Sequence, residues 1–224
     1  MIAWRQHGCR SPYGFIVMTT VQPDPNQRFQ IALDHARADW AAADPAVSCA
    51  LAGCMYTKEG VVAPFFGVPH TVTHPAGEVT AHHGDTRKAA HTSIVIVLLH
   101  YLLTADGTRP ADRWVAFREL PDGLFYAQAF AGHAEGLLAQ RYSSELEAFR
   151  RAAGALGGMR LDLADASFRF QALPRLAIAV LLWSGDEEFP GQARILFDAA
   201  AGHYLPTEDL SGIGDWLAHR LARA

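Results

Sequence analysis

Carboxylate side chains gather in three short stretches near the C-terminal end of the chain. They are Asp186, Glu187 and Glu188 in GDEEFP, Asp198 in ILFD, and Glu208 and Asp209 in LPTED. Carboxylates that meet in space raise one another's pKa unless a cation relieves the repulsion, so a converging group can bind a divalent metal or a cationic ligand, or transfer protons. Carboxylates that stay apart form only a solvated turn and a charged helix start. Nothing resembling the calcium loop DxDxDG is present, so both alternatives stay open.

A polar pair interrupts the most apolar helical stretch of the chain. His100 and Tyr101 lie within SIVIVLLHYLL, whose composition predicts a buried central helix. A single histidine on an apolar helix is more often a hydrogen-bonded core residue, but it can also project into a cavity as a ligand or a proton carrier. We therefore place both residues with the carboxylates as candidate ligand-binding residues.

Two cysteines and two histidines have nearly the spacing of a zinc finger. Cys49, Cys54, His70 and His74 spell C-x4-C-x15-H-x3-H. In zinc fingers the histidines share a helix, whereas PHTVTH is typical of a strand and would separate the two rings by roughly 13 Å. These residues are candidate metal ligands only if the segment bends, and a buried thiol in an apolar stretch is commonplace.

Composition excludes several classes of protein. The formal net charge of −4 lacks the basic surface expected of a nucleic-acid-binding protein. The apolar helical run is about half as long as a membrane span requires, and the N-terminus has no apolar region of signal-peptide length. Three cysteines, an odd number, argue against a disulfide framework and for reduced thiols. Together these observations lead us to expect a cytoplasmic protein without a membrane partner. Neither a GxSxG motif, a GxGxxG motif nor a P-loop occurs.

The periodicity of apolar residues predicts an α+β fold. Helices are expected over residues 25–43, 85–103, 132–140, 144–155 and 207–221, the last with Leu210, Ile213, Leu217 and Leu221 facing inward. Strands are expected in VVAPFFG, PHTVTH, GEVT, RWVAFREL, SFRFQA, LAIAVLLW and ARILFD. Without regular βαβ alternation, this order predicts one domain over residues 25–224. We expect a mixed or mainly antiparallel sheet, a buried central helix, a C-terminal helix, and an N-terminal extension over residues 1–24.

Several motifs taken together resemble a known family. In chain order they are LLHYLL, WVAFREL with PDGLFY, GALGG, LLWSGDEEFP, ILFD and YLPTEDL. They are similar to a family of bacterial and archaeal proteins recorded as a domain of unknown function and met mainly in anaerobes. The resemblance covers roughly residues 27–221 and implies, by analogy alone, an accessory role in metallocofactor or one-carbon metabolism. The many histidines between His70 and His91 depart from the family pattern, so a cofactor bound by them is not implied.

These observations support three hypotheses about function. The first is a small-ligand, metal or metallocofactor-binding protein whose acidic C-terminal segment and His100-Tyr101 pair line a cleft. The second is a hydrolase-like enzyme in which two of the carboxylates act as acid and base or hold a divalent metal. The third is an interaction module whose acidic turn binds a basic partner protein.

Overall fold

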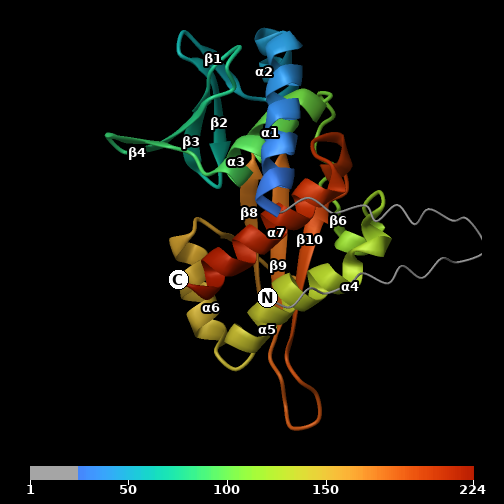
Figure 1. Ribbon diagram of the computed structural model, residues 1–224. Helices are drawn as coiled ribbons and strands as arrows, with labels where there is room; N and C mark the ends of the chain where they lie inside the picture. Colours follow the sequence, from blue (N-terminus) through green and yellow to red (C-terminus); the bar gives the residue numbers. More distant parts are fainter. Residues whose placement is uncertain (1–24) are drawn as a thin grey trace, which may run out of the picture.

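The chain folds as an α+β domain containing two antiparallel sheets, which confirms the predicted fold class. The computed structural model describes residues 25–224, so the expected N-terminal extension over residues 1–24 lies outside the described part of the chain. The smaller sheet stands at the upper left of Figure 1, and the strands of the larger sheet run down its centre. No helix in the described residues is long and apolar enough to cross a membrane.

The smaller sheet is a meander of five strands in chain order. These strands are β1 (Met55–Thr57), β2 (Gly60–Phe65), β3 (Val68–Val72), β4 (Val79–His83) and β5 (Thr86–Ala89). Alternate residues Val61, Ala63 and Phe65 of β2 are buried on one face, as expected for a strand with one face against the core. The predicted small meander is therefore present, with two more strands at its edges.

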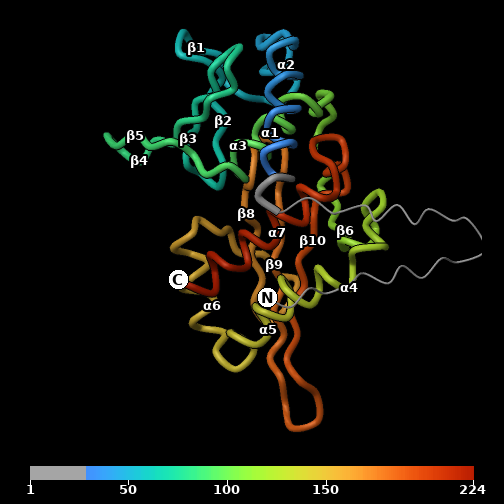
Figure 2. Tube along the Cα trace, in the orientation of Figure 1, coloured from blue at the N-terminus to red at the C-terminus, as the bar shows by residue number. Residues whose placement is uncertain are grey.

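The larger sheet has the strand order β6-β10-β9-β8-β7. Its strands are β6 (Trp114–Ala116), β7 (Met159–Leu161), β8 (Ala166–Leu173), β9 (Leu176–Trp183) and β10 (Gln192–Asp198). The middle strand is β9, which explains why LAIAVLLW is apolar on both faces. The β9–β10 hairpin extends beyond the helices and projects at the bottom of Figures 1 and 2.

Helices connect and cover the two sheets. They are α1 (Pro25–Ala42), α2 (Pro45–Ala52), α3 (Thr92–Thr104), α4 (Ala127–Phe130), α5 (Gly136–Tyr142), α6 (Leu146–Ala155) and α7 (Thr207–Ala222). Between α4 and α5 the chain forms a π-helical turn, η3 (Ala131–Glu135), and short 3₁₀ turns occur at η1 (Phe117–Glu119), η2 (Gly123–Phe125) and η4 (Ala201–His203). Seven of the thirteen residues of α3 are buried, including all of Val95 to Leu99, which confirms the predicted central helix.

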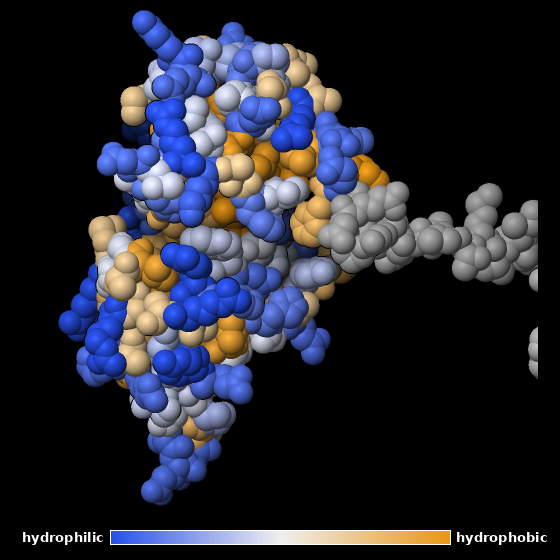
Figure 3. All heavy atoms as spheres, turned by 60° about the vertical axis from the view of Figure 1, so that its left-hand side comes forward, coloured by the Kyte–Doolittle hydropathy of each residue, from blue (hydrophilic) through white to orange (hydrophobic). Residues whose placement is uncertain are grey.

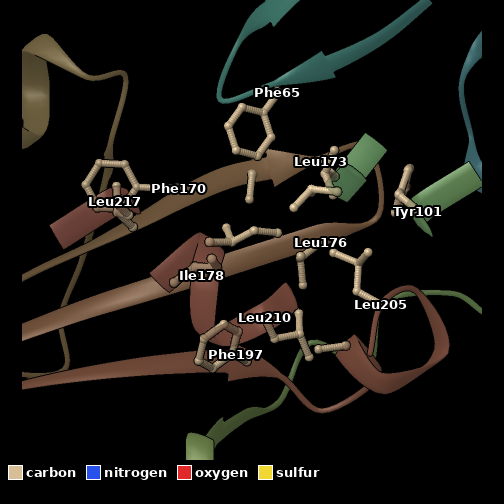
Figure 4. Close-up of a cluster of buried hydrophobic side chains, with 14 of the residues drawn as sticks. Phe65, Tyr101, Phe170, Leu173, Leu176, Ile178, Phe197, Leu205, Leu210 and Leu217 are labelled. Atoms are coloured by element: carbon tan, nitrogen blue, oxygen red, sulfur yellow. The ribbon is translucent and has the colours of Figure 1, made fainter. Parts of the chain in front are cut away.

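The C-terminal helix packs its apolar stripe onto the larger sheet, as its spacing predicts. Leu210, Ile213, Leu217 and Leu221 are all buried. Figure 4 shows Leu210 beside Phe197 of β10 and Leu217 beside Phe170 of β8. This packing fixes the position of the first turns of α7, where Glu208 and Asp209 lie.

Two predicted helix starts are wrong. Residues 86–89 form strand β5 instead of the first turn of a helix, because Gly84 has a φ of +58° and makes a two-residue turn that pairs His83 with Thr86. The central helix begins at Thr92, where the His91 side chain accepts a hydrogen bond from the backbone N–H of Ser93. Helix α6 begins at Leu146, two residues after the predicted start, and the side chain of its N-cap residue Glu145 forms no capping hydrogen bond.

Candidate functional site

A cleft of about 860 Å³ lies between helices that are far apart in sequence. Its walls come from α1, α3, the η1–η2 region, η3 and the first half of α7. Helix α3 contributes Ser93, Ile96, Val97 and His100, whose spacing of three, one and three residues places them on one stripe. Helix α7 contributes Glu208, Ser211, Gly212 and Asp215, which form a second such stripe. The cleft thus lies where a stripe of the central helix faces a stripe of the C-terminal helix.

The central pair of the cleft joins α3 to α7. His100 Nδ1 lies 2.6 Å from Asp209 Oδ2, and the two side chains are 30% and 13% exposed. The hydrogen bond to Asp209 raises the pKa of His100, the negative charges of Asp209, Glu208 and Asp39 raise it further, and burial opposes the shift. The net effect favours a protonated imidazole whose charge is balanced by its neighbour.

A second imidazole and carboxylate face each other across α7 and the π-helical turn. His133 Nδ1 lies 3.6 Å from Asp215 Oδ1, too far for a hydrogen bond, and this buried carboxylate oxygen has no other hydrogen-bond partner among the described residues. The turn carrying His133 is fixed by Glu135, which accepts hydrogen bonds from the Ile195 N–H at 3.0 Å and from Arg194 Nη1 at 3.1 Å. π-Helical turns occur frequently at functional sites.

One lip of the cleft is formed by the PDG turn. Thr207 Oγ1 donates a hydrogen bond to the Pro121 carbonyl at 2.5 Å, which holds the start of α7 against this turn. Asp122 follows with a φ of +57°, a conformation that few residues other than glycine adopt. Gly123 is required next, because a Cβ there would lie 2.0 Å from the Phe117 carbonyl oxygen. Glu208 and Asp122, which follow Thr207 and Pro121, therefore lie at the same lip.

The cleft combines apolar walls with an excess of acid. Side chains that supply apolar surface are Phe29, Ala32, Ile96, Val97, Phe117 and Tyr126. Among the described residues that line it, none is lysine or arginine, whereas carboxylates and imidazoles are contributed by Asp122, Glu208, Asp209, Asp215, His100 and His133. Even with both imidazoles protonated, these groups leave two negative charges uncompensated. The described lining therefore gives the cleft a net negative charge.

Only part of the predicted ligand-binding set meets in this cleft. His100, Glu208 and Asp209 line it together, although His100 lies 109 residues before Asp209 in the chain. Tyr101 points the other way into the core, where its hydroxyl donates to the Ala52 carbonyl at 2.6 Å and accepts from the Arg175 N–H at 3.0 Å. Burial raises the pKa of this phenol, which suits a structural link between α3, α2 and the β8–β9 turn.

Asp198 lies at the end of β10 and is buried. Its carboxylate accepts hydrogen bonds from the backbone N–H groups of Ala111 and Asp112, each at 2.9 Å, and of Ala200 at 2.8 Å. These three bonds use the carboxylate to hold the loop before β6 against the chain that follows β10. Asp198 does not line the cleft.

The residues of GDEEFP lie at the opposite end of the same hairpin. Asp186 is exposed and accepts hydrogen bonds from the N–H groups of Glu188 and Phe189 at 2.9 and 2.7 Å, which lower its pKa. Glu187 and Glu188 are exposed as well. The hairpin end forms the hydrophilic lower tip in Figure 3. The six acids therefore do not converge on one site.

The structure does not assemble the cysteine and histidine set into a metal site. His74 packs edge-on against Trp40 with ring centroids 5.3 Å apart, while the His70 ring contacts Phe65 and its Nδ1 lies 2.8 Å from the Val68 carbonyl. Burial raises the pKa of the Cys54 thiol to about 12, which disfavours a metal-binding thiolate. Within residues 25–224, no group of three or more His, Cys, Asp or Glu residues is arranged to hold a metal ion.

Comparison with known families places the chain in one of them. A family model described as a domain of unknown function, DUF3786, matches residues 44–220. The chain belongs to this family. The match includes α3 and the part of α7 that lines the cleft, so these two walls belong to the family domain, whereas the α1 wall lies before it. No curated protein and no solved structure matches the chain.

Sequence reasoning missed four residues of the cleft that carry titratable groups. Asp122, Tyr126, His133 and Asp215 line it with the predicted residues. For Asp215 a signal exists, because it lies seven residues after Glu208 and so on the same face of an amphipathic helix. For His133 there is none, since a π-helical turn leaves no simple pattern in a single sequence.

Proposed function

We propose that this protein binds a small organic molecule in the cleft between α1, α3, η3 and α7. The carrying observation is the combination of a volume of about 860 Å³ with apolar walls and converging imidazole–carboxylate pairs. Ligand sites in proteins usually have such a volume, a mainly apolar lining and a few polar groups that fix orientation. The lack of three metal ligands in one place among the described residues favours an organic ligand over a metal ion.

Glycine 212 offers a direct test of this proposal. A Cβ added at Gly212 meets no atom within 4 Å, so a phenylalanine there can extend from α7 into the cleft. Gly154 in α6 is equally open to a Cβ and does not line the cleft, so Gly154→Phe is a matched control. We expect a fragment library, screened by ligand-observed NMR, to give ligands that bind the wild type and Gly154→Phe but not Gly212→Phe.

Folding of the variants is checked by circular dichroism and thermal unfolding. If Gly212→Phe does not fold, the smaller Gly212→Leu replaces it, since leucine is also favoured over glycine in a helix. Fragments that bind Gly212→Phe and the wild type equally well, or a library without any bound fragment, would show that the cleft is not a ligand site.

An enzyme of the hydrolase class is a second candidate, and one observation favours it. The imidazole of His100 faces the cleft with Asp209 at 2.6 Å, the arrangement in which a carboxylate orients a histidine for proton transfer. We expect any hydrolysis of p-nitrophenyl esters or phosphates by the wild type to be lost in His100→Gln. Activity that survives this substitution would exclude His100 as the acid or base.

The interaction-module hypothesis concerns a different part of the molecule. The tip of the β9–β10 hairpin exposes Asp186, Glu187 and Glu188 together with Phe189, whose side chain is 65% exposed. A basic partner bound there would leave the cleft free. Loss of a salt-sensitive partner on neutralising the three acids, with fragment binding unchanged, would support this alternative.

A further inference from the structure

We infer that the cleft selects an organic cation: an amine whose charged end lies at the lip formed by Asp122 and Glu208, and whose apolar part lies along α1 and α3. This inference rests on the proposed function, because it names the ligand class of the same cleft. Three features carry it, namely the charge balance of the lining, the position of the two unpaired carboxylates, and the aromatic residues beside them.

The charge balance opposes anionic ligands. His100 is bonded to Asp209, and His133 faces Asp215, so each imidazole already has a carboxylate close to it. No lysine or arginine among the described lining residues offsets Asp122 and Glu208. An anionic ligand would add to this excess, whereas a cation removes it.

The two remaining carboxylates are placed where one ligand can reach both. Pro121 and Thr207 are joined by a hydrogen bond of 2.5 Å, and Asp122 and Glu208 are the next residues of the two segments. Neither carboxylate forms a hydrogen bond or ion pair with another described residue, and both residues are exposed at the mouth of the cleft. Their oxygens are therefore free to accept hydrogen bonds from an ammonium group.

Aromatic side chains complete a site for an amine. Tyr126 and Phe29 line the cleft and are 59% and 53% exposed, so part of each ring is accessible to a ligand. The face of an aromatic ring attracts a cation, and its surface also takes up the hydrocarbon part of a ligand. The walls of α3 add Ile96 and Val97, which are buried except toward the cleft.

Asp215, which also lines the cleft, has a buried carboxylate oxygen with an unmet hydrogen bond in the described part of the chain. Asp215 Oδ1 has no hydrogen-bond partner among the described residues and lies 3.6 Å from His133 Nδ1. The His133 side chain beside it is 53% exposed, and a change of its rotamer would open this oxygen to a donor of the ligand. Satisfying a buried acceptor removes a free-energy penalty, which favours a ligand with a second hydrogen-bond donor.

Three probes that differ mainly in the group at one end test the inference. They are 3-phenylpropylamine, 3-phenylpropan-1-ol and 3-phenylpropionate, measured by isothermal titration calorimetry at pH 7 and low salt. We expect the amine to bind about tenfold more tightly than the alcohol, the anion to bind most weakly, and the amine affinity to fall as salt is added. Binding of the alcohol or the anion as tight as that of the amine would overturn the inference.

Matched variants locate the selectivity. Glu208→Gln should weaken amine binding about fivefold and leave alcohol binding unchanged, because it removes a charge and keeps the shape. Glu187→Gln at the hairpin tip makes the same change of charge far from the cleft and should leave both affinities unchanged. Equal effects of the two variants on amine binding would overturn the proposed position of the charged group.

The same measurements separate this inference from the function on which it rests. If the alcohol binds the wild type and Gly154→Phe but not Gly212→Phe, and the amine has no advantage, the cleft is a ligand site without cation selectivity. If none of the three probes binds the wild type, or all bind Gly212→Phe equally well, the inference fails. The proposed function fails with it only if the fragment library also gives no ligand that Gly212→Phe excludes.

Discussion

The two ends of the β9–β10 hairpin carry acids of the same type in opposite surroundings. At the closed end, Asp186, Glu187 and Glu188 are exposed, and the hydrogen bonds of Asp186 stay within its own loop. At the open end, Asp198 is buried with three backbone donors, and the chain then enters α7, whose Asp209 is bonded to His100. The role of a carboxylate in this protein therefore depends on the groups that contact it rather than on its charge alone.

The difference follows from how much water surrounds each group. A carboxylate at a projecting tip is surrounded by water, which screens its interactions over about 8 Å at physiological salt. A carboxylate in a cleft has water on one side only, so its interactions with an imidazole or a ligand are stronger. For this reason the most distinctive acidic motif of the sequence, GDEEFP, is a weaker candidate for a ligand site than Glu208 and Asp209.

The largest effect is expected from Asp198→Ala. Removal of the carboxylate leaves the N–H groups of Ala111, Asp112 and Ala200 without their acceptor. Water can reach Ala111 and Asp112, which are exposed, whereas the buried Ala200 N–H left unsatisfied costs about 1–3 kcal/mol. We expect the free energy of unfolding, measured by urea denaturation, to fall by about 2 kcal/mol or more. The control is Glu187→Ala at the hairpin tip, which should lower the free energy of unfolding far less. Equal stabilities of the two variants would remove the contrast between the two hairpin ends.

A smaller, pH-dependent effect is expected from Asp209→Asn. The pKa of His100 is higher in the folded protein than in the unfolded chain, where it is near 6.5. The interaction of His100 with Asp209 therefore stabilises the folded state fully at pH values below 6.5, and this contribution is lost as the pH rises through the pKa of the folded state. Because both side chains are partly exposed, the effect is modest. We expect the free energy of unfolding of the wild type to exceed that of Asp209→Asn by about 1 kcal/mol at pH 6. Urea denaturation at pH 6 and pH 9 measures the difference, which should shrink at the higher pH.

Direct titration of the imidazole checks the same pair. In the NMR spectrum, the His100 ring should titrate above the usual pKa of histidine in the wild type and closer to it in Asp209→Asn. A pH-independent loss of stability would instead report only the removal of a negative charge from the first turn of α7. If His100 has the same pKa in the variant as in the wild type, Asp209 is not the cause of the raised pKa of His100.

Much of the fold was predictable because it depends on local periodicity. The alternation along SFRFQA, the purely apolar LAIAVLLW and the stripe of α7 each indicate their element and its buried face. The start of the central helix was not predictable, because Asp85 can either cap a helix or complete a hairpin turn. Asp85 lies in the turn because β4 pairs with β5, and this pairing depends on the rest of the small sheet.

The site was predictable only in its components. His100, Glu208 and Asp209 were chosen by residue type, yet their meeting depends on how α3 packs beside α7, which no short-range pattern specifies. Tyr101 shows the reverse: one position along the same helix turns its side chain from the cleft into the core. Asp122 lies in the cleft because its own backbone is left-handed, and His133 because it lies in a π-helical turn. Both geometries are rare and have no clear signal in a single sequence.

The smallest effect is expected where the sequence motif is most distinctive. The variant Asp186→Asn, Glu187→Gln, Glu188→Gln removes three charges from the hairpin tip without changing side-chain size, and should leave the affinity for 3-phenylpropylamine unchanged in calorimetry. The physical reason is that the tip and the cleft lie apart in the molecule, and exposed charges act over only about a Debye length in physiological salt. If this variant weakens amine binding as much as Glu208→Gln does, the two acidic regions act together. The hairpin would then belong to the ligand site in spite of its position.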